Sequence, residues 1–188
     1  MNILLKLKHW QLFAISWGSG ILLNLFAVLD PFLVLKLFPL AMLLFVFGTF
    51  GWIWAIATGL HPLLPSGTDL NIRKFKILFS IPVIYILLLC LGLGVIMMGD
   101  QQDALSGMGG LTFIIILLHL LSMVCIFYGM RFAAKTLRAV ELGRPVKFSD
   151  YAGEFFLLWF SIIGYWVIQP RINRLAGNSN TAASVSEI

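Results

Sequence analysis

Four long apolar stretches dominate the sequence and limit what it can fold into. In chain order they cover residues 10–29, 38–60, 77–98 and 111–131. A helix rises about 1.5 Å per residue, so roughly 20 apolar residues cross the hydrocarbon core of a bilayer. The sequence therefore predicts an all-α integral membrane protein with four transmembrane helices.

The composition agrees with this prediction. Of the 188 residues, 60% are hydrophobic and only 11% are charged, whereas roughly 25% are charged in soluble domains. Because charged side chains supply most of a soluble surface, a soluble catalytic domain is excluded. The net charge of +5 comes from Lys and Arg in the loops, so we expect no nucleic-acid partner.

The loop charges predict the orientation in the membrane. Basic residues precede the first stretch, occupy loop 61–76 and follow the fourth stretch in segment 132–154. Loop 99–110 carries no Lys or Arg and contains Asp100 and Asp103. Since cytoplasmic loops are rich in Lys and Arg, we expect a protein of the bacterial inner membrane with a cytoplasmic N-terminus.

A fifth hydrophobic element, residues 150–169, is shorter than the other four. Its apolar run is 155–168, and a span needs at least about 17 residues. If the element spans the membrane, Arg171 and Arg174 lie outside, against the charge rule. We expect a re-entrant or interfacial element and a cytoplasmic C-terminus; a tilted span from Ser149 to Gln169 is the alternative.

The domain organisation follows from these elements. No soluble domain fits between such long spans and short loops, so residues 1–175 should form a single helical bundle. The small and polar residues of 176–188 predict a disordered tail.

Small residues repeat every four positions on the second stretch. Gly51, Ala55 and Gly59 form two overlapping small-xxx-small patterns on one helix face. Such patterns let helix backbones approach closely. We expect packing within the bundle, with contact to a second chain as the alternative.

Four polar side chains should lie at a similar depth near the membrane midplane. Counting residues from the inner edge of each span places Asn24, Thr49, Cys90 and His119 in this layer. Polar groups in lipid are costly unless they find partners. The layer is interpreted as structural hydrogen bonding; a small-molecule or proton site centred on His119 is the alternative.

The fourth span should continue beyond the membrane as a helix over 111–142, ending before Gly143. Arg131, Lys135 and Arg138 then share one helix face at three- and four-residue spacing. Such a basic stripe predicts contact with anionic lipid headgroups. A simple topological signal is the competing interpretation.

The sequence contains no recognisable catalytic or metal-binding motif. It contains no zinc-ligand pattern, no paired axial haem ligands and no nucleophile with an adjacent base. We therefore expect no catalytic residue, no metal ligand and no cofactor, and a protein that is not an enzyme.

The C-terminal third carries a distinctive string, RFAAKTLRAVELGRPVKFSDYAGEFFLLWFSIIGYWVIQPRIN, over residues 131–173. Its WFxxIGxWxIQPRxN pattern resembles a signature of small, uncharacterised bacterial multi-pass membrane proteins. The resemblance implies the architecture and a bacterial membrane, and no activity.

These observations predict a non-enzymatic inner-membrane protein that acts through lipid or protein interaction. It would work as a homo-oligomer or as a subunit of a membrane complex. The alternative is a small channel or transporter whose path is lined by the polar layer around His119.

Overall fold

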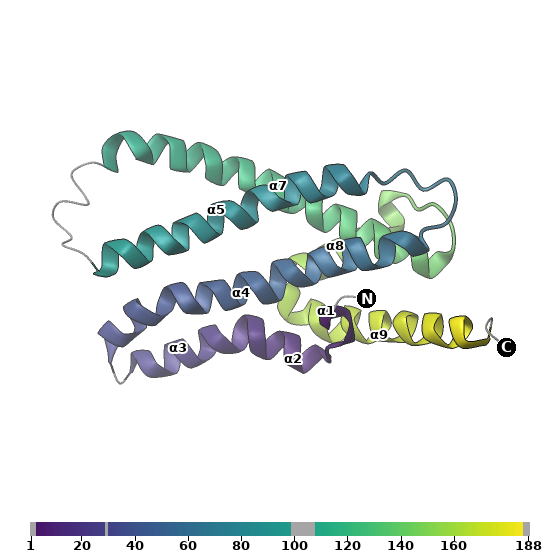
Figure 1. Cartoon of the computed structure of the whole chain (residues 1–188), viewed down its shortest axis with the longest axis horizontal. Helices are drawn as coiled ribbons and strands as arrows, with labels where there is room; N and C mark the ends of the chain where they lie inside the picture. The colour runs from purple at the N-terminus through teal and green to yellow at the C-terminus, as the bar shows by residue number, and fades with distance from the viewer. Residues whose placement is uncertain (1–2, 29, 99–107, 186–188) are drawn as a thin grey trace.

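The computed structural model describes residues 3–28, 30–98 and 108–185, and all regular secondary structure in this part of the chain is helical (Figure 1). The elements in chain order are α1 (Ile3–Lys6), α2 (His9–Phe13), the π-helical turn η1 (Ala14–Gly18), α3 (Ser19–Ala27), α4 (Pro31–Leu60), the 3-10 turn η2 (His61–Leu63), α5 (Ile72–Met98), α7 (Met108–Leu142), α8 (Phe148–Trp159) and α9 (Ser161–Val185).

Three segments are long and apolar enough to cross a membrane: Lys36–Leu63, Ile72–Gly92 and Thr112–Leu142. The prediction of an all-α multi-pass membrane protein is therefore confirmed. The first predicted span, 10–29, is helical from His9 to Ala27, but η1 divides it into short pieces. Its crossing of the membrane stays a prediction.

α3 and α4 form a tight hairpin, and α4 starts immediately after Asp30. The Asp30 carboxylate accepts a hydrogen bond from the Phe32 backbone N–H at 2.9 Å, which caps the first turn of α4. Pro31 occupies the first helical position, where no N–H is needed. α4 therefore begins earlier than the predicted boundary at residue 38.

α7 is a single helix of 35 residues that ends as the sequence predicts. It stops at Leu142, and Gly143 follows with a φ of +62°, a left-handed conformation that favours glycine. α5 runs beside α7, and both contact α4 (Figure 1). Loop 99–110, predicted to lie outside the cell, falls largely outside the described residues.

The interior between α4, α5 and α7 is aromatic. Phe75 stacks on Phe132 with 4.6 Å between ring centroids and on Phe79 with 5.2 Å. Gly129 of α7 lies directly against the Phe79 ring, so a larger residue there would displace it. These rings fix α5 against α7 at the end where the α4–α5 connection lies.

α1 packs on the small-residue face of α4. Leu5 is only 1% exposed, and a Cβ atom added at Gly59 would overlap its side chain. A Cβ atom at Gly51 would lie 3.0 Å from Leu4 Cδ1. Gly51, Ala55 and Gly59 thus lie in a face that contacts the same chain's N-terminal helix.

The fifth hydrophobic element is a helical hairpin, not one continuous helix. Phe160, with φ −88° and ψ 61°, separates α8 from α9. The backbone approaches itself closely here, because a Cβ atom at Gly164 would overlap the Leu157 carbonyl. Only glycine fits at position 164 without movement of the backbone.

The contacts of the hairpin show that α9 returns to the end from which α8 starts. α8 begins beside Arg131 of α7, which bonds Tyr151, and ends at Trp159, whose ring stacks on Phe127 at 4.3 Å. α9 begins beside Trp17, which donates to Ser161 at 3.2 Å. It then runs antiparallel to the N-terminal helices back to α1.

Local interactions define the two ends of the hairpin. The N-cap of α8 is Lys147; Asp150 occupies the third helical position and accepts from the Lys147 backbone N–H at 2.9 Å. This hydrogen bond lowers the pKa of Asp150. α9 is helical to Val185, within the segment 176–188 for which composition predicts disorder.

Candidate functional site

Four charged side chains join α7, α8 and α9. Arg171 donates to Glu141 Oε1 from Nε at 2.7 Å and to Glu154 Oε1 from a terminal nitrogen at 2.8 Å. That terminal nitrogen also bonds Glu141 Oε2. Arg138 completes the cluster, donating to Glu141 Oε2 at 3.1 Å and lying 3.9 Å from Glu154.

The cluster is largely removed from solvent, with Glu154 only 7% exposed. Hydrogen bonding to Glu141 raises the pKa of Arg171 further above its ordinary value, so this guanidinium stays charged. Two cations balance two carboxylates, which leaves little net charge to bind a ligand. The cluster therefore acts as a clamp between the hairpin and α7.

A second polar node holds the N-terminal helix. Gln169 Nε2 donates to the carbonyl oxygens of Leu4 and Leu5 at 3.2 Å and of Leu7 at 2.8 Å. Its Oε1 accepts from Trp52 Nε1 at 2.7 Å. Because a four-residue helix cannot satisfy its own last carbonyls, Gln169 supplies the missing donor.

Thr49, a member of the predicted polar layer, belongs to a third node. Its hydroxyl bonds the Tyr165 hydroxyl at 2.9 Å, and Tyr165 also bonds the Ser16 hydroxyl at 2.9 Å. This node ties α4 to η1 and to α9.

The structure does not bring the other three members of the layer together. Asn24 is exposed and donates to the Gly20 carbonyl of its own helix at 2.8 Å. Cys90 is buried on α5. His119 is exposed on α7, with its ring 6.1 Å from that of Tyr85. Among the described contacts, no hydrogen bond joins any two of the four predicted residues.

Two members of the predicted basic stripe contact α8 of the same chain. Arg131 donates to the Tyr151 hydroxyl at 3.1 Å, and Arg138 donates to the Asp150 carbonyl at 3.1 Å. Both side chains thus reach α8 of the same chain, because α8 covers that face of α7. Among the described hydrogen bonds and ion pairs, none joins Lys135, the third member of the stripe, to α8.

Arg131 and Lys135 nevertheless line a basic pocket between α7 and the start of α5. The pocket has a volume of about 250 Å³. Its lining residues come from two segments that are distant in sequence: Asp69, Leu70, Asn71 and Lys74, and Tyr128, Arg131, Phe132 and Lys135. Three cations and one carboxylate therefore face one hollow.

Local structure fixes the shape of this basic pocket. The His61 ring bonds the Leu70 carbonyl through Nε2 at 3.1 Å, which holds the loop before α5. The Asn71 side chain accepts from the Lys74 backbone N–H at 3.0 Å and starts α5. The spacing of basic residues along the sequence predicted that Arg131 and Lys135 share one helix face. Lys74 lies more than fifty residues earlier, and no local sequence pattern links it to them.

The basic pocket suits an anion, since Lys and Arg side chains provide hydrogen-bond donors and positive charge for phosphate oxygens. Within the described residues no group of three His, Cys, Asp or Glu side chains could hold a metal ion.

Comparison with family models, with curated proteins and with solved structures found no match. The resemblance over residues 131–173 accordingly stays a prediction.

Proposed function

We propose that this chain is a non-enzymatic multi-pass protein of the bacterial inner membrane that binds the phosphate of an anionic lipid headgroup in the basic pocket. The observation that carries the proposal is the convergence of Lys74, Arg131 and Lys135 on one hollow with a single carboxylate, Asp69. Each cation near an anionic membrane surface contributes about 1 kcal/mol of attraction.

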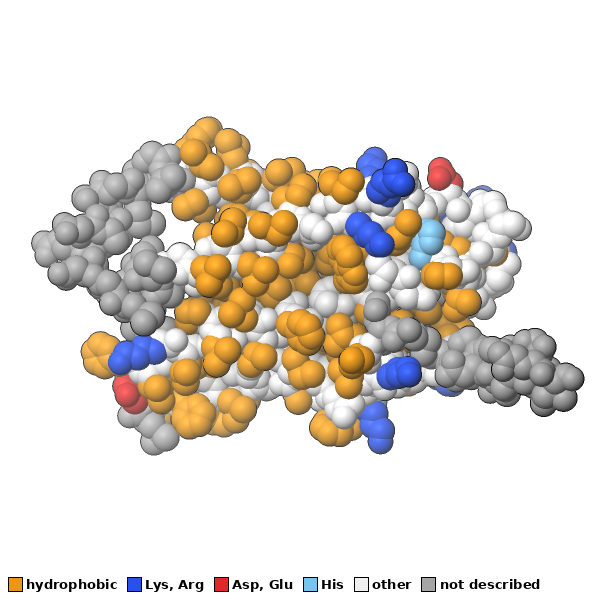
Figure 2. All heavy atoms as spheres, viewed as in Figure 1, with side chains coloured by type: hydrophobic (Ala, Val, Ile, Leu, Met, Phe, Trp, Pro, Cys, Tyr) orange, Lys and Arg blue, Asp and Glu red, His pale blue; other side chains and the backbone are white. Residues whose placement is uncertain are grey.

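The position of the basic pocket supports this proposal. It lies where the apolar segments of α5 and α7 meet their basic ends, at Lys74 and Arg131. In Figure 2, apolar side chains cover the middle of the visible face, and most of the visible Lys and Arg side chains lie toward one end. By the charge rule this end is cytoplasmic, and the α8–α9 hairpin enters the membrane from it and returns.

The basic pocket is also connected to the hairpin. Arg131 lines the pocket and donates to Tyr151 of α8. A bound headgroup would therefore stabilise the hairpin that α8 begins. Such a lipid-stabilised surface fits a protein that works as a homo-oligomer or as a subunit of a membrane complex.

Replacing Lys74 and Lys135 by glutamine should weaken headgroup binding by about thirtyfold, because two cations of about 1 kcal/mol each are lost. The probe is dihexanoylphosphatidylglycerol, whose acyl chains are short, so that its headgroup contributes most of the binding energy. It is added to the purified protein in neutral detergent. Binding is measured by native mass spectrometry, and the affinity of the unaltered protein should fall as salt rises.

The matched control for this experiment is Lys147→Gln with Arg174→Gln. It removes the same charge from two exposed residues outside the basic pocket. The control should keep the affinity of the unaltered protein. Equal affinity in both double variants would refute headgroup binding at the basic pocket.

A further inference from the structure

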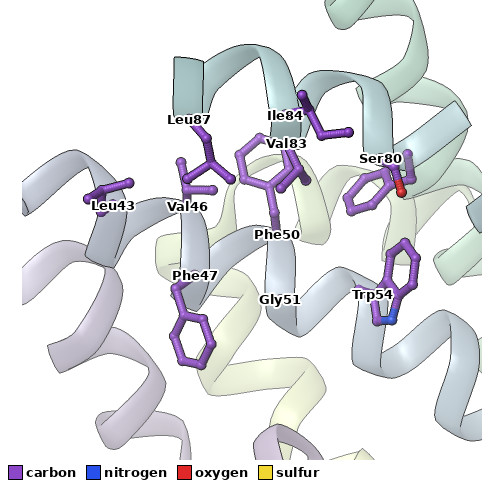
Figure 3. Close-up of a pocket in the computed structure, with 11 residues that line it drawn as sticks. Leu43, Val46, Phe47, Phe50, Gly51, Trp54, Ser80, Val83, Ile84 and Leu87 are labelled. Atoms are coloured by element: carbon purple, nitrogen blue, oxygen red, sulfur yellow. The ribbon is translucent and has the colours of Figure 1, made fainter. Parts of the chain in front are cut away.

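An apolar hollow lies between α4 and α5, away from the basic pocket (Figure 3). It has a volume of about 380 Å³, within the range of small-molecule sites. Val83 and Leu87 of α5 point toward Val46 and Phe50 of α4. Ser80 is the one hydroxyl in the lining, and its Oγ donates to the Lys76 carbonyl at 2.7 Å.

A second apolar hollow, of about 550 Å³, lies between α4 and the N-terminal segment. Leu4, Leu7 and other N-terminal residues form its far wall. The two hollows share Phe47, Gly51 and Trp54 of α4. They therefore flank one face of α4 as a pair of neighbouring grooves.

The extent of the grooves matches one leaflet of a bilayer. The first reaches along α4 from Leu43 to Trp54, which is roughly 16 Å at about 1.5 Å per residue. The second reaches from Phe47 to Ala55, roughly 12 Å by the same rise. One leaflet contributes about 15 Å to the hydrocarbon core.

Cations stand at the same end of both grooves. Arg73 and Lys76 precede Ser80 by seven and four residues, which places them on the groove-facing side of α5, about two turns and one turn toward its start, respectively. Both are exposed. Beside the second groove, the exposed Lys6 lies between Leu4 and Leu7 in the chain.

Two adjoining grooves of leaflet length with cations at one end are complementary to a two-chain anionic lipid. We infer that one anionic diacyl phospholipid of the cytoplasmic leaflet is held across α4, with one acyl chain in each groove and its phosphate between Lys6 and the Arg73–Lys76 pair. This inference rests on the proposed membrane orientation but not on the basic pocket.

The test compares lipids that differ in one feature. The purified protein in neutral detergent is titrated with dioleoylphosphatidylglycerol, dioleoylphosphatidylcholine and single-chain lysophosphatidylglycerol, and bound lipid is counted by native mass spectrometry. Dioleoylphosphatidylglycerol should bind about tenfold more tightly than either of the others, because only it offers both chains and a net negative charge.

Variants locate the bound lipid. Val83→Phe fills the first groove and should weaken the binding of dioleoylphosphatidylglycerol about tenfold. Leu88→Phe alters an exposed residue outside the lining and should leave this affinity unchanged. In a Lys74→Gln, Lys135→Gln background, where the basic pocket no longer contributes, Lys6→Gln with Lys76→Gln should abolish the preference over phosphatidylcholine; Lys147→Gln with Arg174→Gln in the same background should preserve it. If Val83→Phe lowers the melting temperature, Ile84→Trp at the 56% exposed rim replaces it.

A spectroscopic readout places the acyl chain directly. Phosphatidylglycerol brominated on its acyl chains, at low mole fraction in phosphatidylcholine nanodiscs, should quench a saturable part of the tryptophan fluorescence. That part should be missing in Trp54→Phe, since Trp54 lines both grooves. Equal affinity for the charged and the zwitterionic diacyl lipid, or unchanged binding in a folded groove-filled variant, would overturn the inference.

The two lipid sites are separable. Lys74→Gln with Lys135→Gln should leave dioleoylphosphatidylglycerol quenching of Trp54 intact, and Val83→Phe should leave dihexanoylphosphatidylglycerol binding intact. Failure of one site therefore does not imply failure of the other.

Discussion

Replacing Arg171 by glutamine is expected to lower the free energy of unfolding by about 3 kcal/mol, because it leaves Glu154 and Glu141 largely buried with one cation for two carboxylates. Glu154 would then retain only Arg138, whose nearest nitrogen is 3.9 Å away. The α8–α9 hairpin should loosen from α7. Denaturation in mixed SDS and neutral detergent, followed by tryptophan fluorescence, measures the loss.

Two further variants distinguish the clamp from a general charge effect. Arg174→Gln removes an exposed cation three residues away and should change the free energy of unfolding by less than about 0.5 kcal/mol. Adding Glu154→Gln to Arg171→Gln should restore part of the stability, because Glu141 then pairs with Arg138 alone. An Arg171→Gln protein as stable as Arg174→Gln would show that the clamp contributes nothing.

Gln169→Leu is expected to lower the free energy of unfolding by about 3 kcal/mol as well, because it deprives the Leu4, Leu5 and Leu7 carbonyls of their shared donor and the Trp52 indole of its acceptor. Leucine has a similar size, so the loss is one of hydrogen bonds and not of volume. The N-terminal helix should detach from α4 and α9. Limited proteolysis near residue 8, together with the same denaturation assay, reports this detachment.

Asn173→Ala provides the graded control for Gln169→Leu. Asn173 donates to the Leu7 carbonyl at 3.3 Å and accepts from Gln169 at 3.1 Å, so its loss should cost about 1 kcal/mol. A Gln169→Leu protein whose α1 resists proteolysis as well as the unaltered protein would contradict the assigned role.

Helix type and several helix ends could be predicted because they depend on local sequence. Span length follows from the apolar runs, and the end of α7 follows from Gly143. The short fifth run, with Arg171 and Arg174 behind it, favoured a segment that does not simply cross the membrane. The structure shows there a helical hairpin whose second arm returns along the first helices.

The contacts between elements could not be predicted in the same way. Depth along a span placed Asn24 and His119 in one layer, but depth does not say which way a side chain faces, and both are exposed. Spacing placed Arg131 and Arg138 on one face of α7, but nothing local shows that α8 covers this face.

The ion pairs of the clamp could not be predicted from local sequence either. Glu141, Glu154 and Arg171 lie on three separate helices, and only the reversal at Phe160 brings them together. From the sequence, Arg171 served only as a marker of topology. The ion pair between Glu154 and Arg171, which lies seventeen residues later, can be inferred only once the hairpin is known.

We expect the basic pocket, the clamp and both ends of the hairpin to share the cytoplasmic side of the membrane. Single cysteines at Lys147, Arg174 and Lys36, with Cys90 and Cys125 replaced by serine, test this expectation through a membrane-impermeant maleimide. In intact spheroplasts, position 36 should be labelled, whereas positions 147 and 174 should be labelled only in inverted vesicles. Labelling of position 174 from outside the spheroplasts would show that this end of α9 lies outside and would refute the expected orientation.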